Sequence, residues 1–290
     1  MNDRRRPHSR TTLLIGFDSA WTFENRGALI GVFREEDGTL RELTKPQTAN
    51  FTEAADAVSR WRSDMRPGST IVLIDQPTIV TNAAGQRPVE NLVASSVSLR
   101  YGGMRPANTV RAKMFGPEAP VWQFLKQFGG AANPLSPTGD TQVFETYPVL
   151  AMIALGWVLP DKRKTGRLPK YNPERRKTFS IDDWRYVCDR LSEEIAARKL
   201  WGLVAWISEV KAKQSPSKRE QDGIDACICL LVALYLVERK SCLMVGHSGT
   251  GYIVVPHGDG LRRELEERSK KTHRDPTLWV RAFALSAAQQ

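Results

Sequence analysis

Acidic residues stand beside the most apolar stretches of this chain, and this placement restricts the folds that the chain can adopt. Five residues share the setting: Asp18, Asp75, Glu145, Asp222 and Asp225. The first two end apolar, β-branched runs, and the last opens an apolar stretch that continues to Val237. A buried charge without a partner costs several kcal/mol. We therefore expect the five acids to converge around a cation, and a divalent metal is the leading candidate.

The order of elements predicts an α/β fold. We expect strands at 12–18, 28–33, 39–44, 70–75, around Glu145, at 242–246 and at 251–255. We expect helices at 51–65, 121–128, 149–155, within 181–206, after the capping-box pattern Ser217 to Glu220, and at 259–272. The first three strands are predicted to be antiparallel, with a hairpin at Asp37-Gly38, and the last two to close the same mixed sheet, flanked by helices.

The chain is expected to form a single domain over residues 11–258. A disordered basic arm, 1–10, would precede this domain, and a C-terminal helical tail, 259–290, would follow it. Two inserted loops interrupt the domain, at 77–118 and 157–180. The first is too long for an idle loop in a compact domain and is expected to be functional, partly helical, or both.

The charge balance favours an anionic partner. Lys and Arg number 42 against 32 Asp and Glu, a net charge of +10. Such an excess is typical of proteins that bind nucleic acid or anionic membranes, although it also serves general solubility. No apolar run is long enough to span a bilayer, and the N-terminus has no secretory signal. With four cysteines in no metal-finger spacing, a cytoplasmic protein is expected. Protein partners and oligomeric state stay open.

Clustered carboxylates have a specific chemical use. In two-metal phosphoryl transfer, two Mg²⁺ ions about 3.5–4 Å apart activate a water and stabilise the leaving oxygen. Hard cations such as Mg²⁺ or Mn²⁺ take oxygen ligands. Without metal, two like charges 4 Å apart repel by about 4 kcal/mol at an effective dielectric near 20. Asp222 and Asp225 share a helix face at i, i+3, and the buried helix beyond them would hold both near the sheet.

Four sequence blocks resemble the signature blocks of a predicted RNase-H-like nuclease family, domain-of-unknown-function family 429. They are Ile15 to Ala20, Ile74 to Pro77, Glu145 to Pro148 and Asp222 to Ala226. The last block is also similar to the final helix of RuvC-type Holliday-junction resolvases. The resemblance covers roughly residues 12–255. It implies an RNase H-like fold and a divalent-metal acidic site, with Asp18, Asp75 and Asp225 as the principal ligands and Glu145 and Asp222 next.

Each acid also has a simpler interpretation. Asp18 could cap the following turn, and Asp75 could begin a loop. Glu145 could pair with an arginine from the basic stretch 161–177, and Asp222 could be a surface acid. His247 and His257 could assist a leaving group, but a turn or surface position is commoner. Four tryptophans could stack bases, but tryptophans at apolar spacing are usually core residues: Trp21, Trp122, Trp201 and Trp206.

These observations support three hypotheses. The first is a metal-dependent nuclease that hydrolyses phosphodiester bonds of DNA or RNA with Mg²⁺ or Mn²⁺, two ions being expected, and all five acids at its catalytic site. Five basic residues would contact phosphates: Arg163, Lys164, Arg167, Arg175 and Arg176. The second is a catalytically inactive RNase H-like module that binds nucleic acid or a partner. The third is a small-molecule phosphotransferase of the actin/sugar-kinase type, which would need phosphate loops that this chain does not show.

Overall fold

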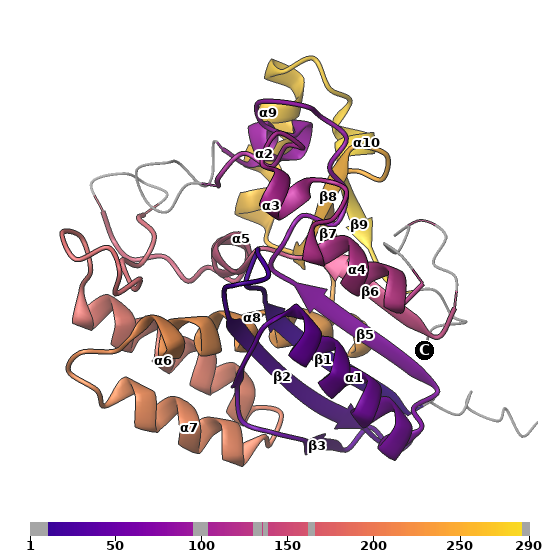
Figure 1. The fold of residues 1–290 in the computed structure, drawn as a ribbon. Helices are drawn as coiled ribbons and strands as arrows, with labels where there is room; N and C mark the ends of the chain where they lie inside the picture. Colours follow the sequence, from indigo (N-terminus) through magenta and orange to yellow (C-terminus); the bar gives the residue numbers. More distant parts are fainter. Residues whose placement is uncertain (1–10, 95–103, 130–134, 136–138, 162–165, 286–290) are drawn as a thin grey trace, which may run out of the picture.

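The computed structural model describes residues 11–94, 104–129, 135, 139–161 and 166–285, so the basic arm 1–10 lies outside the described residues. Two sheets and their helices make up the described part (Figure 1). The first half contains β1 (Thr12–Asp18), β2 (Gly27–Arg34), β3 (Leu40–Glu42), β4 (Gln47–Ala49), α1 (Phe51–Met65), β5 (Ser69–Ile74), α2 (Pro88–Val93), α3 (Ala112–Phe115), α4 (Pro120–Gln127) and β6 (Thr141–Glu145). The second half contains α5 (Pro148–Ala154), α6 (Ile181–Ala196), α7 (Trp201–Lys211), α8 (Lys218–Val237), β7 (Cys242–His247), β8 (Gly251–Pro256), α9 (Asp259–Lys271), α10 (Pro276–Trp279) and β9 (Val280–Phe283).

The main sheet is mixed, as the sequence predicts. Its strand order is β3-β2-β1-β5-β6, and β4 also pairs with β2. β1 pairs antiparallel with β2, and β2 pairs antiparallel with β3 and β4, whereas β5 is parallel to both β1 and β6. The first three strands are therefore not all antiparallel to one another, because β1 and β3 run in the same direction on either side of β2. This corrects the sequence prediction.

Two further parts of the sheet prediction are wrong. The expected strand 39–44 is shorter, and Pro46, which has no backbone N–H to donate, separates it from a second short strand, β4. The hairpin β7–β8 does not close the main sheet but forms a second, three-stranded antiparallel sheet with order β8-β7-β9. The C-terminal tail, predicted to be helical, thus also contributes a strand. Alternation of apolar residues identifies a strand, but it does not specify which sheet the strand joins.

Helices cover both faces of the main sheet, and alternation along β1 separates the two layers (Figure 1). Leu13, Ile15 and Phe17 belong to the core that α1 and α4 cover. Leu14 belongs to the larger core on the opposite face, which includes α8. Gly16 also faces α8, and a Cβ at this position would lie 2.1 Å from the carbonyl oxygen of Ala226. The absence of a side chain there lets α8 lie directly against the strand.

Helix α8 is buried along most of its length, as its apolar sequence predicts. It begins with the predicted capping box, in which Glu220 accepts hydrogen bonds from the backbone N–H and the hydroxyl of Ser217. Its first turns lie at the ends of β1 and β5. The helix therefore carries its N-terminal acids to the carboxyl edge of the parallel strands, where binding sites in such sheets form.

Candidate active site at the strand ends

The pleat of the sheet directs two aspartates toward α8. Asp18 is the last residue of β1 and follows Leu14 and Gly16 on the face that α8 covers. Asp75 follows β5, and its backbone N–H continues the ladder by donating to the carbonyl oxygen of Phe17 at 2.9 Å. It alternates with Leu73, which also belongs to the core on the α8 side. Adjacent parallel strands therefore present two carboxylates to the same helix.

Asp222 and Asp225, from the first turns of α8, complete what we call the aspartate cluster: Asp18, Asp75, Asp222 and Asp225. All four line one cavity of about 750 Å³. Three of them are recessed, with exposed fractions of 6% for Asp18, 7% for Asp222 and 5% for Asp225. Glu145 lies in the wall of the same cavity, so all five acids that the sequence singles out line it.

Burial and mutual repulsion oppose the ionisation of the clustered carboxylates. Burial raises the pKa of Asp18 well above its ordinary value, and the charges of Asp225, Asp75 and Asp222 raise it further. Burial and the charge of Asp225 also raise the pKa of Asp75. Burial raises the pKa of Asp225 to about 7. Such shifts arise where buried carboxylates repel one another, and they are typical of functional sites.

Three neighbours compensate part of this charge. The ammonium of Lys218 is ion-paired with Asp222, and its charge lowers the pKa of Asp18, Asp75 and Asp225. The Tyr171 hydroxyl donates to Oδ1 of Asp225 at 2.7 Å, and Nε2 of Gln221 donates to Oδ2 of the same carboxylate. One ammonium faces four carboxylates, so Lys218 alone does not neutralise the cluster when all four are ionised.

The donor atoms suit a hard cation, although they do not form a ready-made cage. Carboxylate oxygens are the ligands that Mg²⁺ and Mn²⁺ take. Gln221 also lines the cavity, and its buried amide oxygen lacks a hydrogen-bond partner within the described part of the chain. Within the same ranges, however, no group of three or more His, Cys, Asp or Glu side chains is arranged to hold a metal as it stands. A metal bound here would compete with the ammonium of Lys218 for the carboxylate of Asp222.

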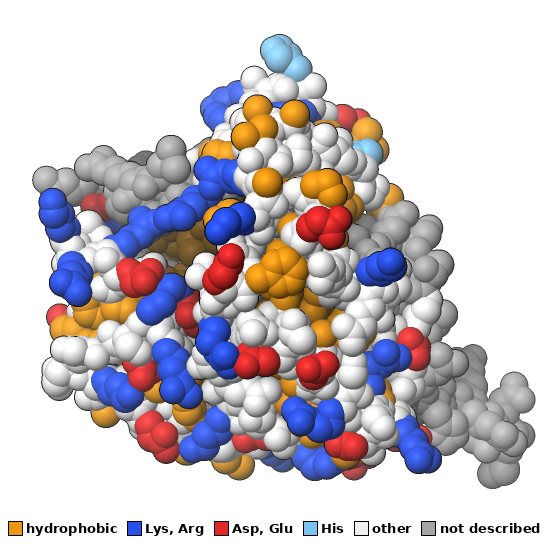
Figure 2. Space-filling view, in the orientation of Figure 1, with side chains coloured by type: hydrophobic (Ala, Val, Ile, Leu, Met, Phe, Trp, Pro, Cys, Tyr) orange, Lys and Arg blue, Asp and Glu red, His pale blue; other side chains and the backbone are white. Residues whose placement is uncertain are grey.

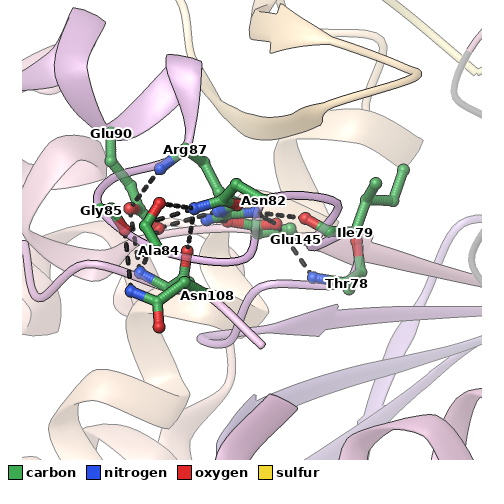
Figure 3. A network of polar contacts seen from close by, with 10 residues as sticks. Thr78, Ile79, Asn82, Ala84, Gly85, Arg87, Glu90, Asn108 and Glu145 are labelled. Atoms are coloured by element: carbon green, nitrogen blue, oxygen red, sulfur yellow. Dashed lines mark hydrogen bonds and ion pairs between the residues drawn. The ribbon is translucent and has the colours of Figure 1, made fainter. Parts of the chain in front are cut away.

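Glu145 differs from the four aspartates in being held by an ion pair with an arginine. The guanidinium of Arg87 donates to both of its oxygens, at 2.9 and 2.6 Å, and the backbone N–H of Thr78 donates to Oε2 at 3.0 Å (Figure 3). Register explains the difference. Glu145 pairs with Ile74, one residue before Asp75, so it lies on the other side of the pleat from the aspartates. The alternative of an ion pair therefore holds, but with an arginine outside 161–177.

The Arg87 network anchors the inserted loop 77–118 at the wall of the cavity. Arg87 and Glu90 are fully buried, and Nε of Arg87 donates to Glu90 at 2.8 Å. Glu90 also accepts from the backbone N–H of Ala107 at 3.0 Å, which ties a second part of the loop to the first (Figure 3). Buried ions that are paired on all sides order the groups around them. The prediction that this loop is partly helical is confirmed by α2 and α3.

The predicted phosphate contacts are distributed unevenly. Arg163 and Lys164 lie outside the described residues. Arg167 makes a double ion pair with Asp183, and Arg176 is exposed away from the cavity lining. Arg175 lines the cavity. Figure 2 shows Lys and Arg side chains bordering a hollow in the surface.

Several cavity residues carry little signal in the sequence. Arg105 and Lys170 are exposed and line the cavity, and Lys218 is recognisable only by its position four residues before Asp222. Tyr171 lies within a basic stretch that gives no reason to single it out. Gln76 and Tyr147 lie in two of the blocks quoted above without an assigned role. These residues reach the cavity only because the fold brings segments that are far apart in the chain together around it.

The two histidines that the sequence singles out, His247 and His257, lie outside the aspartate cluster. Nδ1 of His247 accepts from the backbone N–H of Gly249 at 3.1 Å, and its ring lies 5.9 Å from that of Trp279. His257 lies 3.8 Å from Asp259. Neither residue lines the cavity, in line with the structural interpretation of both.

Comparison with known proteins gives one result. A family model described as "Protein of unknown function (DUF429)" matches residues 16–248. The chain belongs to this family. The matched range begins within β1 and ends just after β7, so it contains the whole aspartate cluster. No curated protein and no solved structure matches the chain. In the described ranges, no helix is long and apolar enough to cross a membrane.

Proposed function

We propose that this protein is a divalent-metal-dependent nuclease that hydrolyses phosphodiester bonds of nucleic acid at the aspartate cluster. The observation that carries the proposal is the convergence of four aspartates from two parallel strands and a helix in one cavity, with a single lysine as counter-ion. A scaffold that buries four acids together loses stability, because each unpaired charge opposes burial. Such a loss of stability is expected where the acids bind a cation.

The surroundings support an anionic substrate. The net charge of the chain is +10, yet the floor of the cavity is acidic and its lining includes Arg105, Lys170 and Arg175. A cation bound by the acids would reverse the local charge, and the basic residues would then attract phosphate groups. The predicted RNase H-like fold is part of this proposal, as is the number of two metal ions.

The proposed ligands are Asp18, Asp75 and Asp225, with Asp222 next. We leave Glu145 out, because Arg87 and Thr78 occupy both of its oxygens. A bound divalent ion would supply an activated water and stabilise charge on the phosphoryl group. The chain itself would orient the acids: the Tyr171 hydroxyl holds Asp225 in place, and the rigid strand ends hold Asp18 and Asp75. In the hydrolysis, a water oxygen forms a bond to phosphorus, the bond to the leaving oxygen breaks, and the leaving oxygen gains a proton.

The test is cleavage of labelled DNA and RNA by the purified protein with Mg²⁺, with Mn²⁺ and with EDTA. Wild-type protein is expected to cleave only with metal, and Asp18→Asn is expected to abolish cleavage. Asp56→Asn, an exposed acid of α1 away from the cavity, is the matched control and should cleave like wild type. Unchanged cleavage in Asp18→Asn, or the absence of cleavage in wild-type protein under all conditions, would contradict the proposal. Metal-independent binding without cleavage would favour the inactive binding module instead.

A further inference from the structure

The carboxylates of the aspartate cluster are recessed. Three of them keep exposed fractions of only 5–7%, although they line a cavity of about 750 Å³. Five parts of the chain supply the remaining walls: residues 19–27, 76–90, 104–114, 145–149 and 169–178. A phosphate therefore has to enter this cavity before it comes within reach of the acids.

A rigid duplex is a poor fit for such a recess. Duplex DNA behaves as a stiff rod with a persistence length of about 50 nm, and its phosphates follow the outer surface of the rod. The cavity, in contrast, falls in the range of roughly 300–1,000 Å³ that is typical of pockets enclosing one small ligand. A flexible strand can place about one or two nucleotides in this volume, whereas a duplex would have to unpair first.

The walls have the chemistry of a single-strand site. Proteins that bind single strands combine cationic side chains along the backbone with aromatic side chains on which bases stack. Arg105, Lys170 and Arg175 provide exposed cationic side chains in this lining. Trp21 and Tyr147 are aromatic residues of the lining, and both are half-buried.

Trp21 is held in a defined orientation. Its ring packs edge-on against Phe115 of α3, with centroids 5.8 Å apart and an interplanar angle of 75°. Its backbone lies in the left-handed region, with φ of 64°, which is uncommon for a bulky residue. Trp122 packs against the core and Trp201 is 62% exposed outside the cavity, so of these three tryptophans only Trp21 is placed to meet a substrate.

We propose that this site takes single-stranded nucleic acid, with a base stacked on Trp21 and the adjoining phosphates drawn in by Arg105, Lys170 and Arg175. This inference rests on the proposed function, since it names the substrate class of the same site. The basic lining and the net charge of the chain favour a polyanionic strand over a free nucleotide.

The experiment measures binding and cleavage separately, at one fixed salt concentration. Fluorescence anisotropy compares a labelled single strand, the same strand in a duplex, and a free mononucleotide, and the cleavage assay uses the same two strands with Mn²⁺. Single-stranded substrate is expected to bind at least tenfold more tightly than duplex. Trp21→Ala should weaken single-strand binding about tenfold, the loss expected for one stacked base. Trp21→Phe should restore most of the affinity, and Trp201→Ala is the matched control that should leave it unchanged.

The outcomes separate the two proposals. Equal or tighter binding of duplex, binding of the mononucleotide as tight as that of the strand, or unchanged affinity in a folded Trp21→Ala variant would overturn the single-strand assignment. Preferential single-strand binding that depends on Trp21, without cleavage under any metal condition, would support the assignment while contradicting the nuclease. Cleavage of duplex at the same rate as single strand would support the nuclease and contradict the single-strand assignment.

Discussion

The ammonium of Lys218 is ion-paired with the carboxylate of Asp222 one turn further along α8, at the edge of the aspartate cluster. The same ammonium acts on Asp18, Asp75 and Asp225, so one lysine is the common counter-ion of four acids. A divalent ion at the cluster would compete with this lysine for the same carboxylates.

Replacing Lys218 by Met should therefore strengthen metal binding. Loss of a neighbouring positive charge is expected to lower the Kd for Mn²⁺ about tenfold, equivalent to about 1.4 kcal/mol. It should also lower the stability of the metal-free protein, because the acids lose their counter-ion. Titration calorimetry with Mn²⁺ measures the first effect and denaturant unfolding in EDTA the second. Weaker Mn²⁺ binding by Lys218→Met would show that the lysine does not compete with the metal.

Asp18→Asn should separate stability from metal binding. The amide removes a carboxyl whose ionisation is opposed in the folded protein by burial and by neighbouring acids, so the metal-free variant is expected to be more stable than wild type by about 1–2 kcal/mol at neutral pH. The variant should lose most of the stabilisation that Mg²⁺ gives to wild-type protein. Thermal unfolding with and without Mg²⁺ measures both effects. A variant that is less stable in EDTA and gains as much as wild type from Mg²⁺ would contradict the assigned role.

The stability of the metal-free protein should fall as the pH rises from about 5 to about 8. The pKa of Asp225 is raised to about 7 in the folded protein, and the pKa values of Asp18 and Asp75 are also raised. Over this range the folded protein binds more protons than the unfolded chain, so each unit of pH weakens folding until these acids ionise. Glu220, with a pKa lowered to about 2, stays ionised throughout. Denaturant unfolding in EDTA at several pH values gives the slope, and a saturating divalent ion should flatten it.

Glu145→Ala should behave in the opposite way to Asp18→Asn. Removal of Glu145 leaves Arg87 buried with only Glu90 as its acidic partner, and breaking a buried ion pair in this way costs about 3–5 kcal/mol. Mn²⁺ affinity should change little, because Glu145 is occupied by Arg87 and Thr78. Unfolding and calorimetry on the same preparation check both statements. A large loss of Mn²⁺ affinity in a variant that stays folded would return Glu145 to the metal ligands.

Gly16→Ala should destabilise the protein by about 3 kcal/mol or more, because the new Cβ would lie 2.1 Å from the carbonyl oxygen of Ala226 and force α8 away from β1. Gly260→Ala is the matched control. Gly260 lies in α9 with no atom within 4 Å of a Cβ, and alanine there should stabilise the helix by roughly 0.5–1 kcal/mol. Chemical denaturation compares the two variants with wild type. Equal stability of Gly16→Ala and wild type would show that the close approach of α8 is not required.

Local patterns in the sequence were enough to predict much of the framework. The apolar runs of β1 and β5, the capping box of α8 and the buried length of α8 depend on residues close together in the chain, so they can be predicted without tertiary information. The four aspartates of the cluster could also be identified from the sequence, since an acid next to an apolar run is recognisable whatever the tertiary packing.

Pairing between distant segments decided the rest. The sequence marks Glu145 as an acid in an apolar run, but only its register with Ile74 places it on the other side of the pleat, where Arg87 meets it. The second sheet depends on β9 pairing with β7 across the chain. Lys218 and Tyr171 acquire their roles because the aspartates lie beside them in space. The sequence by itself determined five acids beside apolar runs, and four of them are buried, because burial follows local apolar content. Tertiary structure alone decided which four of them form the aspartate cluster and which one is paired with Arg87, because that depends on strand register and on how closely α8 approaches Gly16.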